Sequence, residues 1–290
     1  MKLLVTGGHG FIGAHAVRLL SQHHFVLAPG RAELDLLDAG ATEAYLREHK
    51  PDAVLHAATW NATRTSDMDL SRVLENNIRM HFNLVNAQKY FGRLIYYGSG
   101  AEFDRRHWQE SMSESYFGQW VPMDDYGLSK YLIEKSREHD GRSCNLRLFG
   151  VYGPGEDWRI RFLSQACVRV VYDKPIIIQQ NRMFDYTWVE DVIRATEELL
   201  ICEQLPHTVN LSAGSPESLH ELAKRIVRVA KKELPIYVEN PELGQSYSSD
   251  NGYFHKLFPG FCFSSTEESI EKLYSHYASI NGRFDIDDIR

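Results

Sequence analysis

Two residues of this chain, Tyr126 and Lys130, have the spacing that suits proton transfer. On a helix their side chains lie on one face, so the lysine ammonium comes beside the tyrosine phenol. A nearby positive charge favours the phenolate and pulls the tyrosine pKa down from about 10. Such a phenol can protonate the alkoxide that forms when a hydride is transferred to a ketone. Because this pattern also arises by chance on amphipathic helices, the rest of the chain must supply its context.

Three glycines spaced three residues apart, Gly7, Gly10 and Gly13, follow the first apolar run of the chain. Glycine has no Cβ, so such a turn lets backbone N–H groups and a helix N-terminus approach a pyrophosphate. The spacing is a variant of the dinucleotide-binding motif, G-x-x-G-x-x-G in place of G-x-G-x-x-G. A strand before the turn and a helix after it are the context that this motif requires. We therefore predict a dinucleotide site that includes Phe11 and Ile12.

The elements that position these residues alternate through the first half of the chain. Apolar runs typical of strands buried on both faces occupy residues 3–6, 25–28, 53–56, 94–97 and 144–148. The amphipathic stretches between them, expected to be helices, are residues 14–22, 41–49, 73–90 and 126–139. This alternation predicts right-handed crossovers and an α/β fold with a Rossmann-type, doubly wound parallel sheet.

The alternation breaks after residue 153. Helices are expected at residues 160–172, 219–231 and 264–280, strands at 176–179 and 235–239, and the sheet pattern returns at 186–202 and 208–212. We predict an NAD(P)-binding Rossmann domain of residues 1–150 plus about 186–215. The remaining residues, about 151–185 plus 216–290, form a small discontinuous substrate-binding lobe. Ligands of such folds lie at the carboxyl ends of the strands, in the cleft between the two parts.

The composition of the 290 residues excludes several other classes of protein. A net charge of −7 argues against a nucleic-acid surface, although local arginines can still bind an anionic small molecule. The four cysteines are scattered and the thirteen histidines show no metal-ligand spacing, so no metal is predicted. The first strand begins at residue 2 and no apolar run could span a bilayer, so we expect a cytoplasmic protein without a membrane partner.

The end of the second strand distinguishes NADP from NAD. An acidic side chain there accepts hydrogen bonds from the adenosine ribose, whereas an arginine suits a 2′-phosphate. This chain has no acid at that place and has Arg31 just beyond it. A guanidinium can pair bidentately with a phosphate, so we predict NADP as the cofactor, with NAD as the alternative.

Together with Ser99, which closes the run from residue 94, these motifs resemble the extended short-chain dehydrogenase/reductase family. Its members mostly act on nucleotide sugars. Further matches are the segments Leu-His-Ala-Ala-Thr at 55–59, Arg-Leu-Phe-Gly-Val-Tyr-Gly-Pro at 147–154 and Asp-Tyr-Thr-Trp-Val-Glu-Asp at 185–191, and an asparagine, Asn77, in a helix flanking the sheet. The resemblance covers nearly the whole chain. It implies that Tyr126 is the acid/base, that Lys130 also holds the nicotinamide ribose, and that Ser99 donates a hydrogen bond to the substrate oxygen.

The resemblance also implies cofactor contacts outside the glycine turn. These contacts are Ala57 and Ala58 at a strand end, Phe149, and Asp35 with Leu36 against the adenine. Asp35 has an alternative role as a helix cap, since an acid-rich loop leads to the next helix.

Departures from the family pattern reduce the number of reactions that this chain could catalyse. Nucleotide-sugar dehydratases follow the serine or threonine with Asp-Glu, but this chain has Gly100 and Ala101. The combined epimerase–reductases carry a cysteine at the place of Ala101 and a histidine in the substrate loop, and neither is present. The chemistry left is ketone reduction, or 4-epimerisation through a transient ketone. Glu102, next in the chain, is either catalytic or a solvated loop acid.

The substrate contacts are less closely defined. The arginine that usually precedes Asp185 is Phe184 here, so the candidates for binding a pyrophosphate are Arg159, Arg161 and Arg182. Trp158 or Trp188 is a candidate for stacking a nucleobase, although most tryptophans serve packing.

Three hypotheses follow for the function. The first is an NADPH-dependent reductase of a nucleotide-linked 4-keto sugar, and the second is an NAD-dependent nucleotide-sugar 4-epimerase. The third is a catalytically inactive cofactor-sensing protein, which would be expected to have lost Tyr126 or Lys130. Residues 73–90 carry more apolar side chains than one sheet contact needs. With residues 126–139, they predict a homodimer through a four-helix bundle, as in the family.

Overall fold

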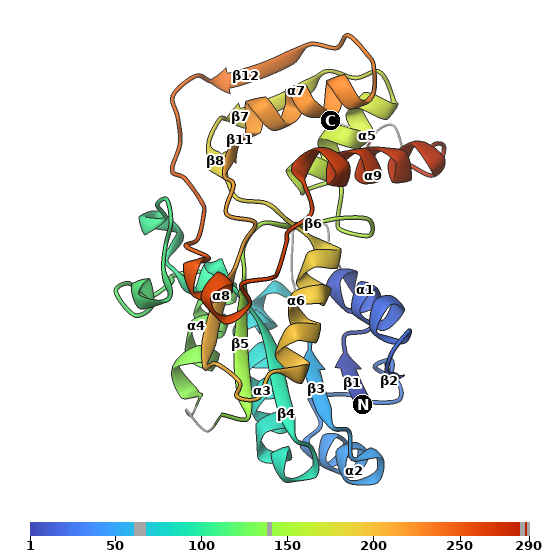
Figure 1. The fold of residues 1–290 in the computed structure, drawn as a ribbon, viewed down its shortest axis with the longest axis vertical. Coiled ribbons are helices and arrows are strands. Elements are labelled where there is room, and N and C mark those ends of the chain that lie inside the picture. Colours follow the sequence, from blue (N-terminus) through green and yellow to red (C-terminus); the bar gives the residue numbers. More distant parts are fainter. Residues whose placement is uncertain (61–67, 138–140, 285–287, 289–290) are drawn as a thin grey trace.

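The computed structural model describes residues 1–60, 68–137, 141–284 and 288, and a six-stranded sheet forms its centre (Figure 1). The strand order is β10-β5-β4-β3-β1-β2, and all neighbours are parallel. The strands are β1 (Lys2–Thr6), β2 (Phe25–Leu27), β3 (Ala53–His56), β4 (Arg93–Ser99), β5 (Ser143–Leu148) and β10 (Thr208–Leu211). The strand order reverses between β1 and β3, and such a switch point opens a ligand crevice at the carboxyl ends. The predicted doubly wound parallel sheet is confirmed.

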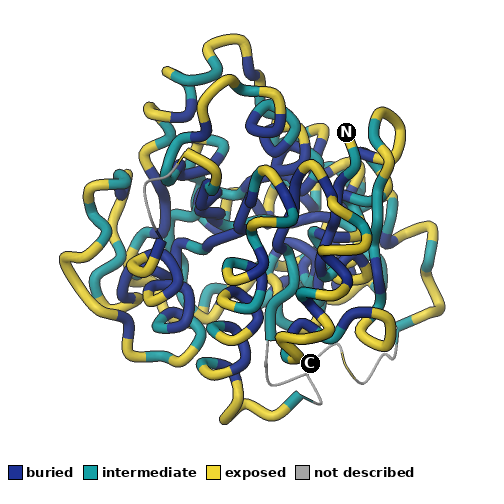
Figure 2. The backbone as a smooth tube through the Cα atoms, turned by 90° about the horizontal axis from the view of Figure 1, so that it is seen from below, coloured by how far each residue is buried: buried dark blue, intermediate teal, exposed yellow. Residues whose placement is uncertain are grey.

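Helices cover both faces of this sheet. On one face lie α1 (Phe11–Leu20) and α6 (Val189–Ile201), and on the other α2 (Ala39–His49) and α3 (Val73–Asn86), with α4 (Asp125–Ser136) beside α3. Successive strand side chains point to opposite faces, so β1 contributes Leu3 and Val5 to one core and Leu4 to the other. Buried backbone therefore lies in the middle of the molecule, with exposed residues at its outer turns (Figure 2).

A second apolar core lies beyond the carboxyl end of the sheet, at the top of Figure 1. It packs α5 (Phe162–Val171), α7 (Leu219–Val229) and α9 (Thr266–Ser279) with the parallel pair β7 (Ile176–Gln180) and β12 (Ile236–Asn240). Two short pairs join this core to the sheet region: β6 (Val151–Tyr152) with β9 (Thr187–Trp188), and β8 (Met183–Phe184) with β11 (Glu217–Ser218).

Some element boundaries differ from the sequence prediction. Helix α1 begins at Phe11, directly after Gly10, rather than at residue 14. Helix α3 ends at Asn86 and a separate 3-10 turn, Gln88–Tyr90, follows it. The segment 186–202, where a sheet pattern was expected, is the short strand β9 followed by α6. A short helix, α8 (Gly252–Leu257), was not predicted and inserts Phe254 into the sheet core. Residues 138 and 139 of the helix predicted over 126–139 lie outside the described residues.

Candidate active site

The glycine turn sits between β1 and α1 and requires glycine at two places. Gly7 has φ +69°, and a Cβ on it would lie 2.7 Å from backbone atoms of Ala58. A Cβ on Gly13 would lie 2.0 Å from the Gly7 carbonyl oxygen. Gly10 is the N-cap of α1 and supplies no capping side chain, so the first-turn N–H groups, beginning with Phe11, lack a side-chain partner. This cradle fits the pyrophosphate of a dinucleotide.

The end of β3 completes this cradle. The Ala58 N–H donates to the Thr6 hydroxyl oxygen over 3.3 Å, and that hydroxyl contacts the His56 ring nitrogen at 2.8 Å. Ala57 follows β3 directly, and its N–H donates to the Thr6 carbonyl over 3.2 Å. The structure therefore brings Ala57 and Ala58 to the glycine turn.

The residues predicted for the adenosine end lie in the loop between β2 and α2. The Arg31 side chain is 63% exposed, pairs with the Asp35 carboxylate at 3.5 Å and lies 5.3 Å above the Trp60 ring. Leu36 is buried in the core formed by α2 and α3. The Arg31 guanidinium is thus exposed to solvent and close to the Asp35 carboxylate.

The alternative role of Asp35 as a helix cap is wrong. The N-cap of α2 is Asp38, whose carboxylate accepts the Ala41 N–H over 2.9 Å. Asp35 instead accepts the Leu37 N–H over 3.0 Å, which shapes the loop before the helix.

Ser99, Tyr126 and Lys130 converge at the carboxyl end of β4. Ser99 is the last residue of that strand and Tyr126 lies in the first turn of α4. The Ser99 hydroxyl accepts the Ala101 N–H over 3.1 Å and lies close enough to the Tyr126 phenol to lower its pKa. Lys130 donates from Nζ to the Tyr97 carbonyl over 2.9 Å, and the same nitrogen lies 5.8 Å from the centre of the Tyr126 ring. The three residues named as catalytic from the sequence are therefore neighbours.

Burial sets the protonation states of this group. Burial raises the pKa of the Tyr126 phenol, against the lowering effects of the Ser99 hydroxyl and the charges of Arg161 and Arg105. The expectation that Lys130 would bring the net tyrosine pKa down is therefore wrong for the chain alone. Burial also lowers the pKa of Lys130 to about 8, because the interior disfavours an ammonium. At neutral pH the phenol holds its proton and Lys130 is charged.

Glu102 is neither a solvated loop acid nor open to a substrate. It is fully buried, its Oε1 accepts the Ser99 N–H over 3.0 Å, and its Oε2 accepts from Arg147 Nε over 2.6 Å. Asn145 donates from Nδ2 to both oxygens of Glu102 and, over 2.9 Å, to Glu134. This buried ionic network lies next to Ser99 and links β4, α4 and β5 through hydrogen bonds.

Asn77 has a positioning role. Its Oδ1 accepts the Trp60 N–H over 2.7 Å, and its Nδ2 donates to the Ser129 hydroxyl over 3.3 Å. Ser129 in turn donates to the Tyr126 carbonyl over 2.7 Å. The asparagine therefore links the loop after β3 to the helical turn that carries the phenol.

The candidate substrate residues fall into two groups. Arg161 influences the pKa of Tyr126, and both Arg161 and Arg182 influence that of Tyr186, so Arg161 lies within electrostatic reach of the phenol and Arg182 within reach of Tyr186. Trp158 instead packs edge-on against Phe284 at 5.2 Å. It lines a different hollow, of about 510 Å³.

Trp188 and Phe149 are interior residues. Trp188 is 4% exposed and packs against Tyr152, so stacking of a nucleobase on it is excluded. Phe149 is fully buried in an aromatic cluster with Phe103 and Tyr247. Tyr247 was not predicted, because nothing in its local sequence signals that it returns to the end of β4.

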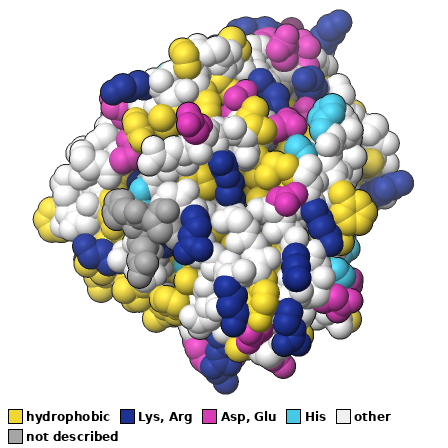
Figure 3. Space-filling model, turned by 60° about the horizontal axis from the view of Figure 1, so that its bottom comes forward, with side chains coloured by type: hydrophobic (Ala, Val, Ile, Leu, Met, Phe, Trp, Pro, Cys, Tyr) yellow, Lys and Arg dark blue, Asp and Glu magenta, His cyan; other side chains and the backbone are white. Residues whose placement is uncertain are grey.

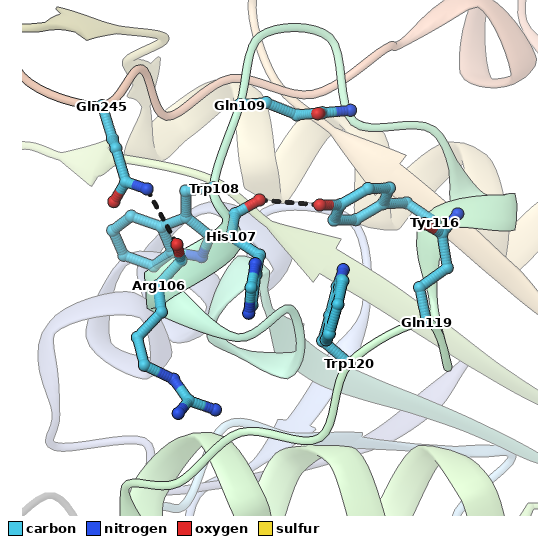
Figure 4. A pocket seen from close by; sticks show the side chains of 8 residues that line it. All are labelled: Arg106, His107, Trp108, Gln109, Tyr116, Gln119, Trp120 and Gln245. Atoms are coloured by element: carbon cyan, nitrogen blue, oxygen red, sulfur yellow. Dashed lines mark hydrogen bonds between the residues drawn. The ribbon is translucent and has the colours of Figure 1, made fainter.

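A hollow of about 520 Å³ (Figure 4) is lined in part by Trp108 and Tyr116, which also pack against this aromatic cluster. Within it the His107 and Trp120 rings stack at 3.8 Å, and the Tyr116 hydroxyl donates to the His107 carbonyl over 2.7 Å. The lining residues are Arg106, His107, Trp108, Gln109, Tyr116, Gln119, Trp120 and Gln245. The hollow contains none of Ser99, Tyr126 and Lys130, so it is not the candidate active site.

Charged side chains of both signs lie on the surface of the molecule. On the face in Figure 3, basic side chains are interspersed with acidic and hydrophobic ones, although the chain as a whole is acidic. Within the described ranges, no His, Cys, Asp and Glu side chains gather as a metal site would require. No described helix has both the length and the apolar character needed to cross a bilayer.

The chain is similar to known proteins in both sequence and fold. The model of the NAD dependent epimerase/dehydratase family matches residues 3–211. A GDP-L-fucose synthase from Azorhizobium caulinodans is 35% identical over 254 residues, covering 79% of this chain and 80% of that protein.

Two solved structures share the fold. A UDP-glucose 4-epimerase from Thermotoga maritima with UDP-glucose superposes with a TM-score of 0.82 at 22% identity, covering 97% and 99% of the two chains. A GDP-mannoheptose C4 reductase from Campylobacter jejuni with NADP bound superposes with a TM-score of 0.80 at 17% identity, covering 95% and 98%. The resemblance predicted from the motifs is confirmed, and the chain belongs to the NAD-dependent epimerase/dehydratase family.

Proposed function

We propose that this chain reduces the 4-keto group of a nucleotide-linked sugar, with a hydride from NADPH and a proton from Tyr126. The observation that carries the proposal is the half-buried Tyr126 phenol, whose pKa is raised so that it is protonated at neutral pH and which lies beside the Ser99 hydroxyl. A general acid must hold its proton before the reaction, and this phenol does. No carboxylate or thiol side chain stands at positions 100 and 101 to remove a proton from carbon.

The glycine turn, Ala58 and the loop at Arg31 would hold the dinucleotide. The bound nicotinamide supplies the hydride. NADP is favoured because Arg31 lies near the end of β2 with its guanidinium exposed, and NAD is the alternative. The C4 reductase that shares the fold carries NADP, which agrees with this assignment.

Each reactive residue has one task in the proposed reduction. Ser99 donates a hydrogen bond to the keto oxygen and orients it toward Tyr126. Tyr126 transfers its phenol proton to that oxygen as the alkoxide develops. Lys130, with its ammonium near the phenol ring, stabilises the resulting phenolate.

The lobe of about residues 151–185 plus 216–290 would bind the rest of the nucleotide sugar. Arg161 and Arg182 are the candidates for its pyrophosphate, since both lie within electrostatic reach of Tyr186 and Arg161 also lies within reach of Tyr126. Trp158 is retained only as a candidate for the nucleobase. All four cysteines are free thiols, which suits a reducing cytoplasm.

The second candidate function is an NAD-dependent nucleotide-sugar 4-epimerase. It uses the same three residues, and a UDP-glucose 4-epimerase shares the fold over nearly the whole chain. The absence of an acid at the end of β2 counts against it, because epimerases of this family retain NAD.

One experiment distinguishes these candidates. The purified protein is incubated with NADPH and a panel of 4-keto-6-deoxy nucleotide sugars, and the loss of absorbance of the reduced nicotinamide is followed. Consumption of NADPH with one of these sugars supports the reductase. Conversion of a UDP-hexose to its 4-epimer without added cofactor would favour the epimerase instead.

We also propose a homodimer through α3 and α4, which pack side by side. Phe82 on α3 and Leu132 on α4 are 38% and 39% exposed, although both are large and apolar. Pairing of the two helices with those of a second copy would bury these side chains. Light scattering should give twice the 33.4 kDa mass of the chain, and a monomer at micromolar concentration would refute the dimer.

A further inference from the structure

Tyr247 reaches the end of β4 from the C-terminal part of the chain. An ideal Cβ on Gly100 would lie 2.3 Å from the Tyr247 hydroxyl oxygen, closer than any real contact allows. The phenol therefore occupies the space that a side chain at position 100 would take, directly after Ser99. This is the position at which dehydratases of the family carry an acid.

The ring of Tyr247 is held firmly while its hydroxyl stays accessible. Trp108, Phe149 and Phe184 surround the ring at centroid distances of 4.0, 5.1 and 5.2 Å. The residue is only 6% exposed, yet its hydroxyl is not one of the described polar atoms that are sealed from solvent without a partner. The packed ring therefore fixes the position of a hydroxyl that is open to solvent and can bind a ligand that displaces water.

The groups around Tyr247 are those of the active site. Tyr126, Arg105, Arg161 and Glu102 all lie close enough to influence the pKa of the Tyr247 phenol. Burial is the main cause that raises the pKa of the Tyr247 phenol above its ordinary value, so the hydroxyl stays protonated and can act as a donor. The site therefore presents two protonated phenols, Tyr126 near Ser99 and Tyr247 at Gly100.

We propose that Tyr247 is a substrate-binding residue that donates a hydrogen bond to the sugar hydroxyl next to the reacting carbon. The inference rests on the proposed 4-keto reduction. In a 4-keto-6-deoxy sugar, C5 carries a methyl group and the ring oxygen, so the hydroxyl on a carbon adjacent to C4 is the one on C3. The substrate class is thus narrowed to 4-keto sugars that retain the C3 hydroxyl.

The test compares Tyr247→Phe with the wild-type protein on two substrates. These are a 4-keto-6-deoxy nucleotide sugar that the wild type reduces and its 3-deoxy analogue. Loss of one hydrogen bond should lower kcat/KM for the first about tenfold and leave the second unchanged. The Kd for NADPH and the melting temperature should stay at wild-type values, because phenylalanine keeps the ring packing.

Tyr116→Phe is the matched control. It removes the same atom from a tyrosine packed at the same aromatic cluster, whose hydroxyl donates to the His107 carbonyl instead. Its kcat/KM should stay within about twofold of wild type on both substrates, because surface changes away from a site have small effects.

Equal kcat/KM for Tyr247→Phe and wild type would overturn the inference, as would an equal loss on both substrates. If the wild type reduces none of the 4-keto sugars, the proposed function fails by itself. Calorimetry with UDP-glucose and GDP-mannose then decides the inference: weaker binding to Tyr247→Phe supports a sugar contact, and unchanged or absent binding rejects it.

Discussion

The two ends of the candidate active site are built in opposite ways. At the reactive end, Ser99 and the helix that carries Tyr126 pack against a buried ion pair. The pair joins Glu102 and Arg147 at 2.6 Å, and both side chains are at most 1% exposed. At the adenosine end, Arg31 and Asp35 pair at 3.5 Å with side chains 63% and 41% exposed. The interior pair fixes a geometry, whereas the surface pair leaves a side chain free to turn toward a ligand. Substitutions should therefore damage turnover or stability at the first end and only cofactor affinity at the second.

The largest effect is expected at Tyr126. Tyr126→Phe removes the proton donor and should lower kcat by about 100- to 10,000-fold, the usual contribution of a positioned acid. The Kd for NADPH, measured by fluorescence titration, should change little, because the ring and Lys130 remain. A variant that retains half of the wild-type rate would reject Tyr126 as the acid.

Breaking the buried pair should cost stability rather than a single catalytic step. Arg147→Met leaves the Glu102 carboxylate buried without its guanidinium and should lower the free energy of unfolding by about 3–5 kcal/mol. Asp35→Asn breaks the exposed pair and should change it by less than about 1 kcal/mol. Urea denaturation followed by circular dichroism measures both. Similar losses for the two variants would remove the contrast between the two ends.

This contrast also marks how far the sequence could predict the site. The strands at residues 3–6 and 53–56 were predictable because both faces of a central parallel strand are apolar. Tyr126 and Lys130 could be singled out because their spacing is local, and Ser99 because the chain resembles a known family. Glu102 was not, because its partners Asn145 and Arg147 lie 43 and 45 residues further along the chain. Only the pairing of β4 with β5 brings them beside it.

The same limit applies to backbone geometry. The first turn of α1 was missed because its N-cap is Gly10, which has no side chain to signal a helix start. Tyr247 was missed because a contact between it and Gly100 depends on the course of the whole C-terminal part of the chain. Local patterns therefore predicted most of the elements and the candidate proton donor, and tertiary packing decided what lies around them.

The pH dependence of kcat/KM should reflect the lowered pKa of the buried Lys130. Burial lowers the pKa of Lys130 to about 8, so the free enzyme loses this charge as the pH rises through that value. The raised pKa of Tyr126 keeps the phenol protonated over the same range. We expect kcat/KM to be level below pH 8 and to fall above it by about tenfold per pH unit.

Lys130→Arg provides the control for this profile. An arginine keeps its charge throughout the range, so the fall above pH 8 should disappear even if the rate is lower. A wild-type profile that stays level to pH 9.5 would contradict the assignment of this pKa to Lys130.

The smallest effect is expected at the exposed end. Among the described residues, Arg31 is held by a surface ion pair with Asp35 and by its place above Trp60, contacts that a 2′-phosphate can replace. Arg31→Ala should weaken NADPH by about 1.5–3 kcal/mol, the contribution of a charged hydrogen bond, and leave NADH almost unchanged. Arg18→Ala removes another exposed guanidinium, paired with Glu190, and should affect neither cofactor. Equal weakening of NADPH and NADH by Arg31→Ala would mean that Arg31 does not recognise the 2′-phosphate, because only that phosphate distinguishes the two ligands.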